Sequence, residues 1–164
     1  MIEVRRLRPD EAGLLRDVRL RALREAPEAF ATRYDEARAR PPQYWAELAS
    51  DSDARVSIVA LDGDRGVGLV SGWLLESGNA WLARLWVDPG ARGAGVGLRL
   101  IEAVADWARE RGAPVLELSV TANNTAAAAL YASAGFAETG RRRPLPADPS
   151  RTEIFLSRPL GPAG

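Results

Sequence analysis

Residues 80–111 read AWLARLWVDPGARGAGVGLRLIEAVADWARER, and this stretch settles the architecture of the chain. Residues 80–87 are typical of a strand, and a glycine-rich turn at Arg92–Gly97 leads from it into a long helix. Apolar residues of that helix recur at 3.6-residue spacing, which predicts one buried face; they are Leu100, Ile101, Val104, Ala105, Trp107 and Ala108. Gly112 is typical of a helix end. The apolar run Val115–Val120 then predicts a parallel strand–helix–strand unit.

Upstream, two turn signals separate three predicted antiparallel strands. Asp62-Gly63-Asp64 lies between Arg55–Leu61 and Gly66–Leu75, and Ser77-Gly78-Asn79 precedes Ala80. A first strand at Ile2–Leu7 is followed by predicted helices after Pro9-Asp10 and after Pro41-Pro42, with an irregular segment at Glu25–Phe30.

Downstream, the Ala-rich segment Thr125–Ala134 predicts a helix. Phe136–Arg143 and Arg151–Arg158 predict a last hairpin across a Pro144–Ser150 loop. At about 150 residues per domain, the 164 residues form one domain, 1–164. The expected class is therefore α/β, of the α+β type, with a mixed sheet flanked by helices.

The composition excludes whole classes of chemistry. The sequence has no Cys, no His and no Lys, so all 22 basic residues are Arg. Zinc sites built from Cys and His, disulfides, Cys nucleophiles, Ser-His-Asp triads and a phosphate loop that needs Lys are all excluded. Chemistry must come from carboxylates, hydroxyls, Arg, backbone amides or a cofactor, and we expect no metal.

Charge and hydropathy limit the partners. The 22 basic residues balance 22 acidic ones, whereas a nucleic-acid binder normally shows a basic excess. The N-terminus lacks the apolar core of a signal peptide. No apolar run reaches the roughly 20 residues of a membrane span. We expect no nucleic-acid or membrane partner and a cytoplasmic location.

The glycine turn favours anion binding. Gly93, Gly95 and Gly97 let the backbone approach a ligand, and the following helix adds the positive end of its dipole. The dinucleotide pattern GxGxxG does not fit, because Leu100 stands where its third glycine should be. The alternative is a merely tight connection between strand and helix.

Two motifs together resemble those of a known family. Trp86–Pro89 followed by Arg92–Gly97 is similar to the acyl-CoA-binding signature (R/Q-x-x-G-x-G/A) of the GNAT superfamily of N-acyltransferases. Asn124–Phe136 reads N-x-x-A-x-x-L-Y-x-x-x-G-F and resembles the second signature of that family. The resemblance implies a mostly antiparallel seven-stranded sheet, flanked by about four helices, with a splayed parallel pair holding the cofactor.

The resemblance also implies acetyl-CoA as co-substrate. Its pyrophosphate would lie on the glycine turn, its pantetheine arm along the end of the strand 80–87, and Asn124 would bond the arm. The implied cofactor-binding residues are Leu85, Trp86, Val87, Arg92, Gly93, Ala94, Gly95, Val96, Gly97 and Asn124. Asn also favours a helix N-cap, a role that Asn124 can combine with binding.

By the same resemblance, Tyr131 is the general acid that protonates the leaving thiolate. The alternative is a core aromatic. The base is open: Glu117 and Glu76 are the carboxylate candidates, Ser119 stands where some relatives carry Glu, and a water relay is preferred. The only charged residue in the strand 80–87 is Arg84.

The resemblance also implies where the acceptor binds. In such enzymes the N-terminal helical segment forms the acceptor side, so the candidate lining residues are Phe30, Tyr34, Glu36 and Trp45, although aromatic residues here are commonly core. Arg141–Arg143 is either an anion-attracting run or a solvated loop edge.

The sequence thus predicts an enzyme that acetylates a primary amine of a small molecule or peptide by direct sequential transfer. The alternatives are a catalytically silent acyl-CoA sensor and a structural partner-binding domain. The resemblance also implies that a homodimer could form through sheet edges or terminal hairpins.

Overall fold

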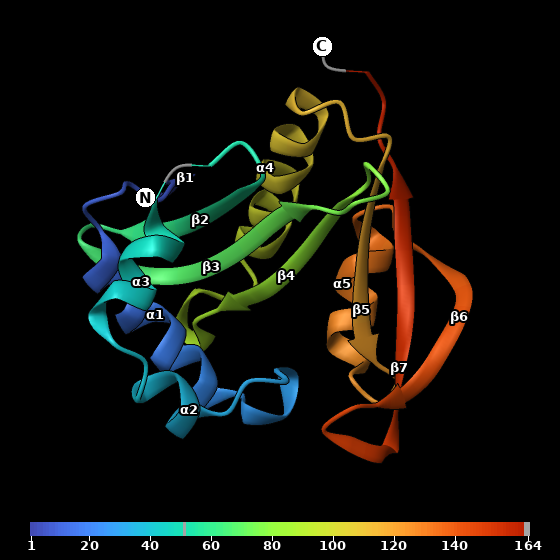
Figure 1. Ribbon diagram of the computed structural model, residues 1–164, viewed down its shortest axis with the longest axis horizontal. Coiled ribbons are helices and arrows are strands. Elements are labelled where there is room, and N and C mark those ends of the chain that lie inside the picture. The colour runs from blue at the N-terminus through green and yellow to red at the C-terminus, as the bar shows by residue number, and fades with distance from the viewer. Residues whose placement is uncertain (51, 163–164) are drawn as a thin grey trace.

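Seven strands form one mixed sheet in the computed structural model, which describes residues 1–50 and 52–162 (Figure 1). The strands are β1 (Ile2–Arg6), β2 (Arg55–Asp62), β3 (Arg65–Leu74), β4 (Ala80–Val87), β5 (Val115–Thr121), β6 (Ala137–Leu145) and β7 (Asp148–Pro159). The helices are α1 (Ala12–Glu25), α2 (Tyr34–Arg38), α3 (Pro42–Ala49), α4 (Val96–Glu110) and α5 (Thr125–Ser133). Short 3₁₀ turns lie at Pro27–Ala29 and Pro89–Ala91.

The sheet order is β1-β2-β3-β4-β5-β7-β6, and every neighbouring pair is antiparallel except β4 and β5. The parallel pair follows from the sequence, since α4 crosses from the end of β4 to the start of β5. The predicted fold class and the parallel pair are confirmed.

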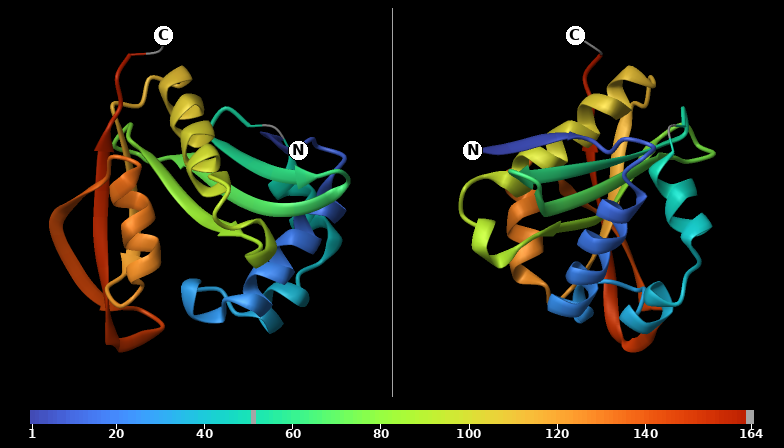
Figure 2. Two further views of the ribbon diagram at one scale, coloured as in Figure 1. Left: turned by 180° about the vertical axis from the view of Figure 1, so that it is seen from behind. Right: turned by 90° about the vertical axis from the view of Figure 1, so that its left-hand side faces the viewer.

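Helices cover both faces of the sheet. Helices α4 and α5 lie on one face, and α1, α2 and α3 lie on the other (Figures 1 and 2). Alternation along β2 matches this arrangement: Ile58 and Ala60 join the core beneath α4, while Val59 and Leu61 join the core beneath α1. A strand that is buried on both faces reads as a continuous apolar run, as Ile58–Leu61 does.

A glycine lets α4 approach β3 closely. A Cβ at Gly72 would lie 2.8 Å from Cγ1 of Val104, which is closer than packed carbon atoms come. This contact seats α4 on the sheet and fixes the position of its N-terminus, where the glycine turn lies.

Two local predictions differ from the structure. Helix α2 was not predicted, because its five residues are too short to show a period. The predicted Pro144–Ser150 loop was wrong: β6 runs to Leu145 and β7 begins at Asp148. Proline misled the prediction there, and an edge strand such as β6 tolerates it.

None of the helices in residues 1–50 and 52–162 combines the length and apolar character that crossing a bilayer requires. Those residues also contain no group of three or more His, Cys, Asp or Glu side chains that could hold a metal ion.

Candidate active site

The strands β4 and β5 pair only at their starts and then separate. Ala80 pairs with Leu116 and Trp81 with Glu117, and from Leu82 onward no β4–β5 pair is present in the described chain. Figure 1 shows the two strands diverging toward the carboxyl end of β4. A cleft of about 320 Å³ lies where they separate. It is lined by side chains that include Arg19, Phe30, Trp73, Trp81, Arg84, Leu85, Ser119, Asn124, Tyr131 and Glu153.

A bulge in β4 shapes one wall of this cleft. Leu69 of β3 pairs with Trp86 and Ser71 pairs with Ala83, so Arg84 and Leu85 both stand opposite the single residue Val70. Arg84 has φ 59°, and it is the only non-glycine residue of the described chain with positive φ. Bulges of this kind usually place glycine at that position. The β4 bulge therefore holds an arginine where the backbone itself favours glycine.

The glycine turn after β4 presents an open row of backbone donors. No acceptor in residues 1–50 or 52–162 takes a hydrogen bond from the backbone N–H groups of residues 93–98. Gly93 and Gly95 have φ of 87° and 79°, and a Cβ at either would have no heavy atom within 4 Å. This arrangement is a cradle for an anion at the N-terminus of the 15-residue helix α4.

The third glycine has a different role. A Cβ at Gly97 would lie 3.1 Å from Cδ2 of Leu130, so this glycine allows α4 and α5 to approach. Val96 is buried in the core at the same turn. Within the predicted Arg92–Gly97 turn, the part that is open to a ligand is therefore Gly93, Ala94 and Gly95. The first backbone N–H groups of α4 follow directly after it.

Arg92 and Trp86 are both occupied by contacts within the protein. Arg92 Nε donates to the Val87 carbonyl oxygen at 2.9 Å, and its guanidinium pairs with Glu25 at 2.9 Å. The Trp86 indole N–H donates to the same Glu25 carboxylate at 3.0 Å. These bonds tie the end of β4 to the end of α1. Trp86 is buried beneath α1, so only its backbone could contact a ligand along β4.

Asn124 caps α5. Its Oδ1 accepts a hydrogen bond from the Ala127 backbone N–H at 3.2 Å, which confirms the predicted capping role. The side chain also lines the cleft. Binding of a cofactor by Asn124 stays a prediction.

Tyr131 lies on α5 and lines the cleft from the side opposite β4. Its ring contacts Phe136 edge to face, with 5.8 Å between centroids, and the residue is only 8% exposed. No hydrogen bond joins its hydroxyl to another described residue. Burial raises the pKa of the Tyr131 phenol above its ordinary value, so the proton is held at neutral pH. Tyr131 thus packs in the core and also offers a protonated hydroxyl to the cleft.

The structure brings neither carboxylate candidate to the cleft wall. Glu117 accepts a hydrogen bond from Asn79 Nδ2 at 2.9 Å beside the paired start of β4 and β5, and Glu76 is exposed in the turn before β4. Among the described residues, the lining of the cleft includes neither.

A different carboxylate does line the cleft. Glu153 of β7 is 8% exposed and accepts hydrogen bonds from Ser119 Oγ and Arg143 Nε, both at 2.6 Å. Although burial opposes it, these two bonds hold the pKa of Glu153 below its ordinary value. Sequence reasoning missed Glu153, because the β5–β7 register brings it to Ser119 and no local pattern shows that register.

Of the four residues predicted to line the acceptor side, one lines the cleft and three lie elsewhere. Phe30 lines the cleft, whereas Trp45 is fully buried in the core beneath α1, Tyr34 packs against the same core, and Glu36 is exposed. The aromatic residues of α2 and α3 are therefore core, because α1 needs apolar partners on its outer side. The run Arg141–Arg143 lies exposed on β6, where Arg143 reaches Glu153.

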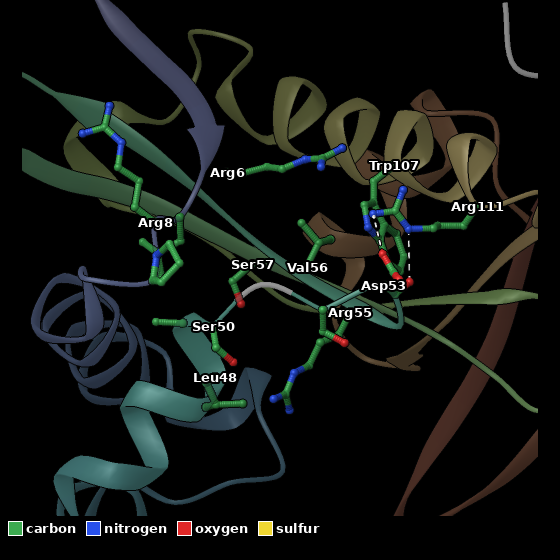
Figure 3. A pocket seen from close by; sticks show the side chains of 14 residues that line it. Arg6, Arg8, Leu48, Ser50, Asp53, Arg55, Val56, Ser57, Trp107 and Arg111 are labelled. Carbon is green, nitrogen blue, oxygen red and sulfur yellow. Dashed lines mark hydrogen bonds and ion pairs between the residues drawn. The ribbon is translucent and has the colours of Figure 1, made fainter.

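A larger cavity, of about 720 Å³, lies elsewhere, between the ends of β1, β2 and α4 (Figure 3). Two of its arginines have partners within the chain: Arg6 pairs with Glu110 at 2.7 Å, and Arg111 Nε donates to the Asp53 carbonyl oxygen at 3.1 Å. It borders neither the glycine turn nor Tyr131. We therefore assign the chemistry to the smaller cleft, which the β4 bulge and Tyr131 line and which lies along the strand that leads into the donor row.

Residues 19–136 match the model of a family described as "Acetyltransferase (GNAT) family". Among curated relatives, streptothricin acetyltransferase of Streptomyces lavendulae is 41% identical over 96 residues, covering 55% of this chain and 48% of that protein. The [ribosomal protein bS18]-alanine N-acetyltransferase of Escherichia coli K12 is 40% identical over 83 residues, covering 49% of this chain and 56% of that protein. The chain spans about half the length of these curated relatives.

Solved structures share the fold. An acetyltransferase of the GNAT family from Streptococcus pneumoniae superposes with a TM-score of 0.82 at 19% identity, covering 98% of this chain and 100% of that one. A Bacillus anthracis protein assigned as a streptothricin acetyltransferase, solved in complex with acetyl coenzyme A, has a TM-score of 0.63 at 25% identity, covering 70% and 67%.

Proposed function

Since the chain belongs to the acetyltransferase (GNAT) family, we propose that it transfers an acetyl group from acetyl-CoA directly to a primary amine. The acceptor is a small molecule or the amine of a peptide. Named relatives acetylate acceptors of both kinds, streptothricin and the alanine of a ribosomal protein.

One observation carries the proposal: the open row of N–H groups at residues 93–98 lies at the end of the strand that borders the cleft. Such a row, at the positive end of a helix dipole, fits a pyrophosphate. Gly93 and Gly95 leave room for it, because no side chain fills the space in front of them. The residues present therefore fit the anionic part of acetyl-CoA.

The remaining binding roles follow from position. Leu85, Trp86 and Val87 would offer backbone groups to the pantetheine arm, since β4 has no strand partner on this side after Trp81. Asn124 would add a side-chain contact, and Arg92 would keep the Val87 carbonyl in place. When bound, acetyl-CoA supplies an activated thioester, so the protein needs no nucleophile of its own.

The proton transfers assign Tyr131 a role. As the amine nitrogen bonds to the acetyl carbon, the carbon–sulfur bond breaks and its electron pair goes to sulfur. Tyr131 gives its phenolic proton to that thiolate. Its hydroxyl lines the cleft and is protonated at neutral pH, as a proton donor must be. The amine loses one proton to an ordered water, with Glu117 or Glu76 as the more distant carboxylates.

Two-substrate kinetics test the direct route. We expect release of free CoA that equals the acetylated amine formed, with intersecting initial-rate lines when both substrates are varied. Parallel lines, or protein that keeps a radioactive acetyl group after removal of acetyl-CoA, would contradict direct transfer. Binding of acetyl-CoA without release of CoA for any amine would favour the sensor alternative instead.

A further inference from the structure

Two arginines that form no ion pair with any described carboxylate are part of the cleft wall. Arg19 of α1 and Arg84 of the β4 bulge both line the cleft. Arg19 is only 6% exposed, and its Nη1 is fully buried without a hydrogen-bond partner among the described residues. A buried guanidinium donor that lacks an acceptor is costly, and such groups are normally paired.

No carboxylate of the described residues neutralises this pair. Glu28 and Glu153 also line the cleft, but neither forms an ion pair with Arg19 or Arg84, and Glu153 is already held by Arg143 and Ser119. Burial first, and then the charge of Arg84, lower the pKa of Arg19 to about 10. Burial likewise lowers the pKa of Arg84. Both stay positively charged at neutral pH, so this wall carries two uncompensated charges.

Each guanidinium faces an aromatic ring. Arg19 lies 4.7 Å from the ring centroid of Phe30, and Arg84 lies 5.5 Å from that of Trp73. In each contact the guanidinium carbon lies over the ring, and a cation–π contact of this kind uses none of the N–H groups as hydrogen-bond donors. The aromatic rings thus orient the arginines and leave donors for a ligand.

The backbone at Arg84 adds a third observation. Its φ of 59° lies in the left-handed region, which is strained for a residue with a side chain and unstrained for glycine. Backbone strain of this kind is typically found at functional sites, where the side chain has a role in binding or catalysis. Glycine would relieve the strain at Arg84 but would remove the guanidinium.

We propose that Arg19 and Arg84 form an oxyanion subsite for the acceptor, so the amine that is acetylated also carries a carboxylate or a similar oxyanion, as an amino acid does. This inference rests on the proposed function and names its substrate class. The anionic group is bound and not altered. The phosphates of the co-substrate have a separate place, since residues 93–98 do not line the cleft.

Matched pairs of acceptors test the subsite. The probes are α-amino acids, their α-carboxamides, which keep the amine and lose the charge, and aminoalkylphosphonates, which replace one oxyanion by another. For the preferred side chain, we expect kcat/KM of the wild-type protein to be at least about 10-fold higher for the acid than for the amide, because a hydrogen bond to a charged group contributes about 1.5–3 kcal/mol.

The decisive variant is Arg84→Gly, which suits the backbone and should fold at least as well as the wild type. We expect KM for the acid to rise at least about 10-fold, while KM for the amide and for acetyl-CoA stays within about twofold. Arg19→Met should act in the same direction. Arg38→Ala, which removes an exposed arginine of α2, is the matched control and should change none of these constants.

Several outcomes would overturn the subsite. They are equal turnover of acid and amide by the wild type, an acid preference that survives in both variants, and a rise in KM for acetyl-CoA alone. Release of CoA with neutral amines only would overturn the subsite and keep the proposed function. If no amine releases CoA, the proposed function fails. The subsite then stands only if an amino acid, but not its amide, raises the melting temperature of the wild type and not of Arg84→Gly.

Discussion

At the scale of single residues, the proposed chemistry depends on a hydroxyl that faces the cleft and has no hydrogen-bond partner among the described residues. Tyr131 contributes an aromatic ring to the core, and no described residue accepts or donates a hydrogen bond at its oxygen. A buried tyrosine hydroxyl usually finds a partner. The partner that completes Tyr131 in our account is the sulfur of the leaving group.

Replacing Tyr131 by Phe keeps the ring and removes the proton donor. We expect kcat to fall about 100-fold or more, since general acids contribute about 10²–10⁴-fold. The dissociation constant of acetyl-CoA, measured by calorimetry, should change less than about twofold. Unchanged turnover in a folded Tyr131→Phe protein would show that the acid assignment is wrong.

Gly95 provides a second test at this scale. With φ of 79°, it should tolerate alanine poorly, and we expect Gly95→Ala to cost about 1–2 kcal/mol and to weaken acetyl-CoA binding. Gly13→Ala is the matched control: Gly13 lies in α1 with open space around its Cβ position, so alanine should stabilise the protein by up to about 1 kcal/mol. Denaturant melts with and without acetyl-CoA measure both effects, and equal effects of the two substitutions would contradict the account.

At the scale of elements, the periodicity of apolar residues predicted the regular helices and strands. It did not predict features that depend on contacts between residues far apart in the sequence. The helix at 96–110 and the strands at 55–62 and 115–121 show clear patterns, and the structure contains them. The β4 bulge has no local signal, because Arg84 is an unusual residue for the left-handed region. The position of Glu153 beside Ser119 depends on the β5–β7 register, which the sequence alone does not reveal.

The glycine turn shows the same division. Its motif and its place between a strand and a helix were readable from the sequence, and so was the capping role of Asn124. That Gly97 serves close packing against Leu130, while Gly93 and Gly95 leave open space, required the three-dimensional contacts.

The connection between β1 and α1 carries a pH-dependent contact. Arg5 binds Glu11 through two hydrogen bonds of 2.8 Å, and the Arg8 backbone N–H donates to the same carboxylate at 2.7 Å. Chiefly through the Arg5 bond, the pKa of Glu11 falls from 4.5 to about 2 in the folded protein. A carboxyl group whose pKa is lower in the folded state than in the unfolded state stabilises the fold at pH values above its unfolded-state pKa. This contribution is lost as the pH falls toward its folded-state pKa.

We therefore expect the free energy of unfolding to decrease as pH falls from about 4.5 toward 2, in part through Glu11. Glu11→Gln should be less stable than the wild type at pH 7, and the difference should shrink with acidification. Denaturant titrations across this range measure it. A difference that stays constant between pH 7 and pH 2 would show that Glu11 does not contribute through its charge.

At the scale of the whole molecule, the sheet consists of two parts that meet at a short parallel junction. Within residues 1–50 and 52–162, strands β1–β4 and β5–β7 share only the pairs Ala80–Leu116 and Trp81–Glu117, and α4 connects the two parts (Figure 2). The proposed acetyl-CoA site lies where the parts separate, with Leu85 on one side and Tyr131 on the other. A ligand bound there bridges both parts.

Binding of acetyl-CoA should therefore raise the melting temperature. A ligand that binds only the native state stabilises it by about 2.7 kcal/mol at 100 times its dissociation constant, which corresponds to about 5–10 °C for a protein of this size. Differential scanning fluorimetry with increasing acetyl-CoA measures the shift. An unchanged melting temperature at millimolar acetyl-CoA would show that the protein does not bind this co-substrate. It would favour a structural, partner-binding role.

The central claim is catalytic transfer to an amine, and release of free CoA from acetyl-CoA across a panel of amines tests it most directly. We predict thiol release above the protein-free rate with at least one class of amine, an equal yield of the acetylated amine by mass spectrometry, and loss of both in Tyr131→Phe. A protein that binds acetyl-CoA, yet releases CoA with no amine of the panel, would contradict the claim.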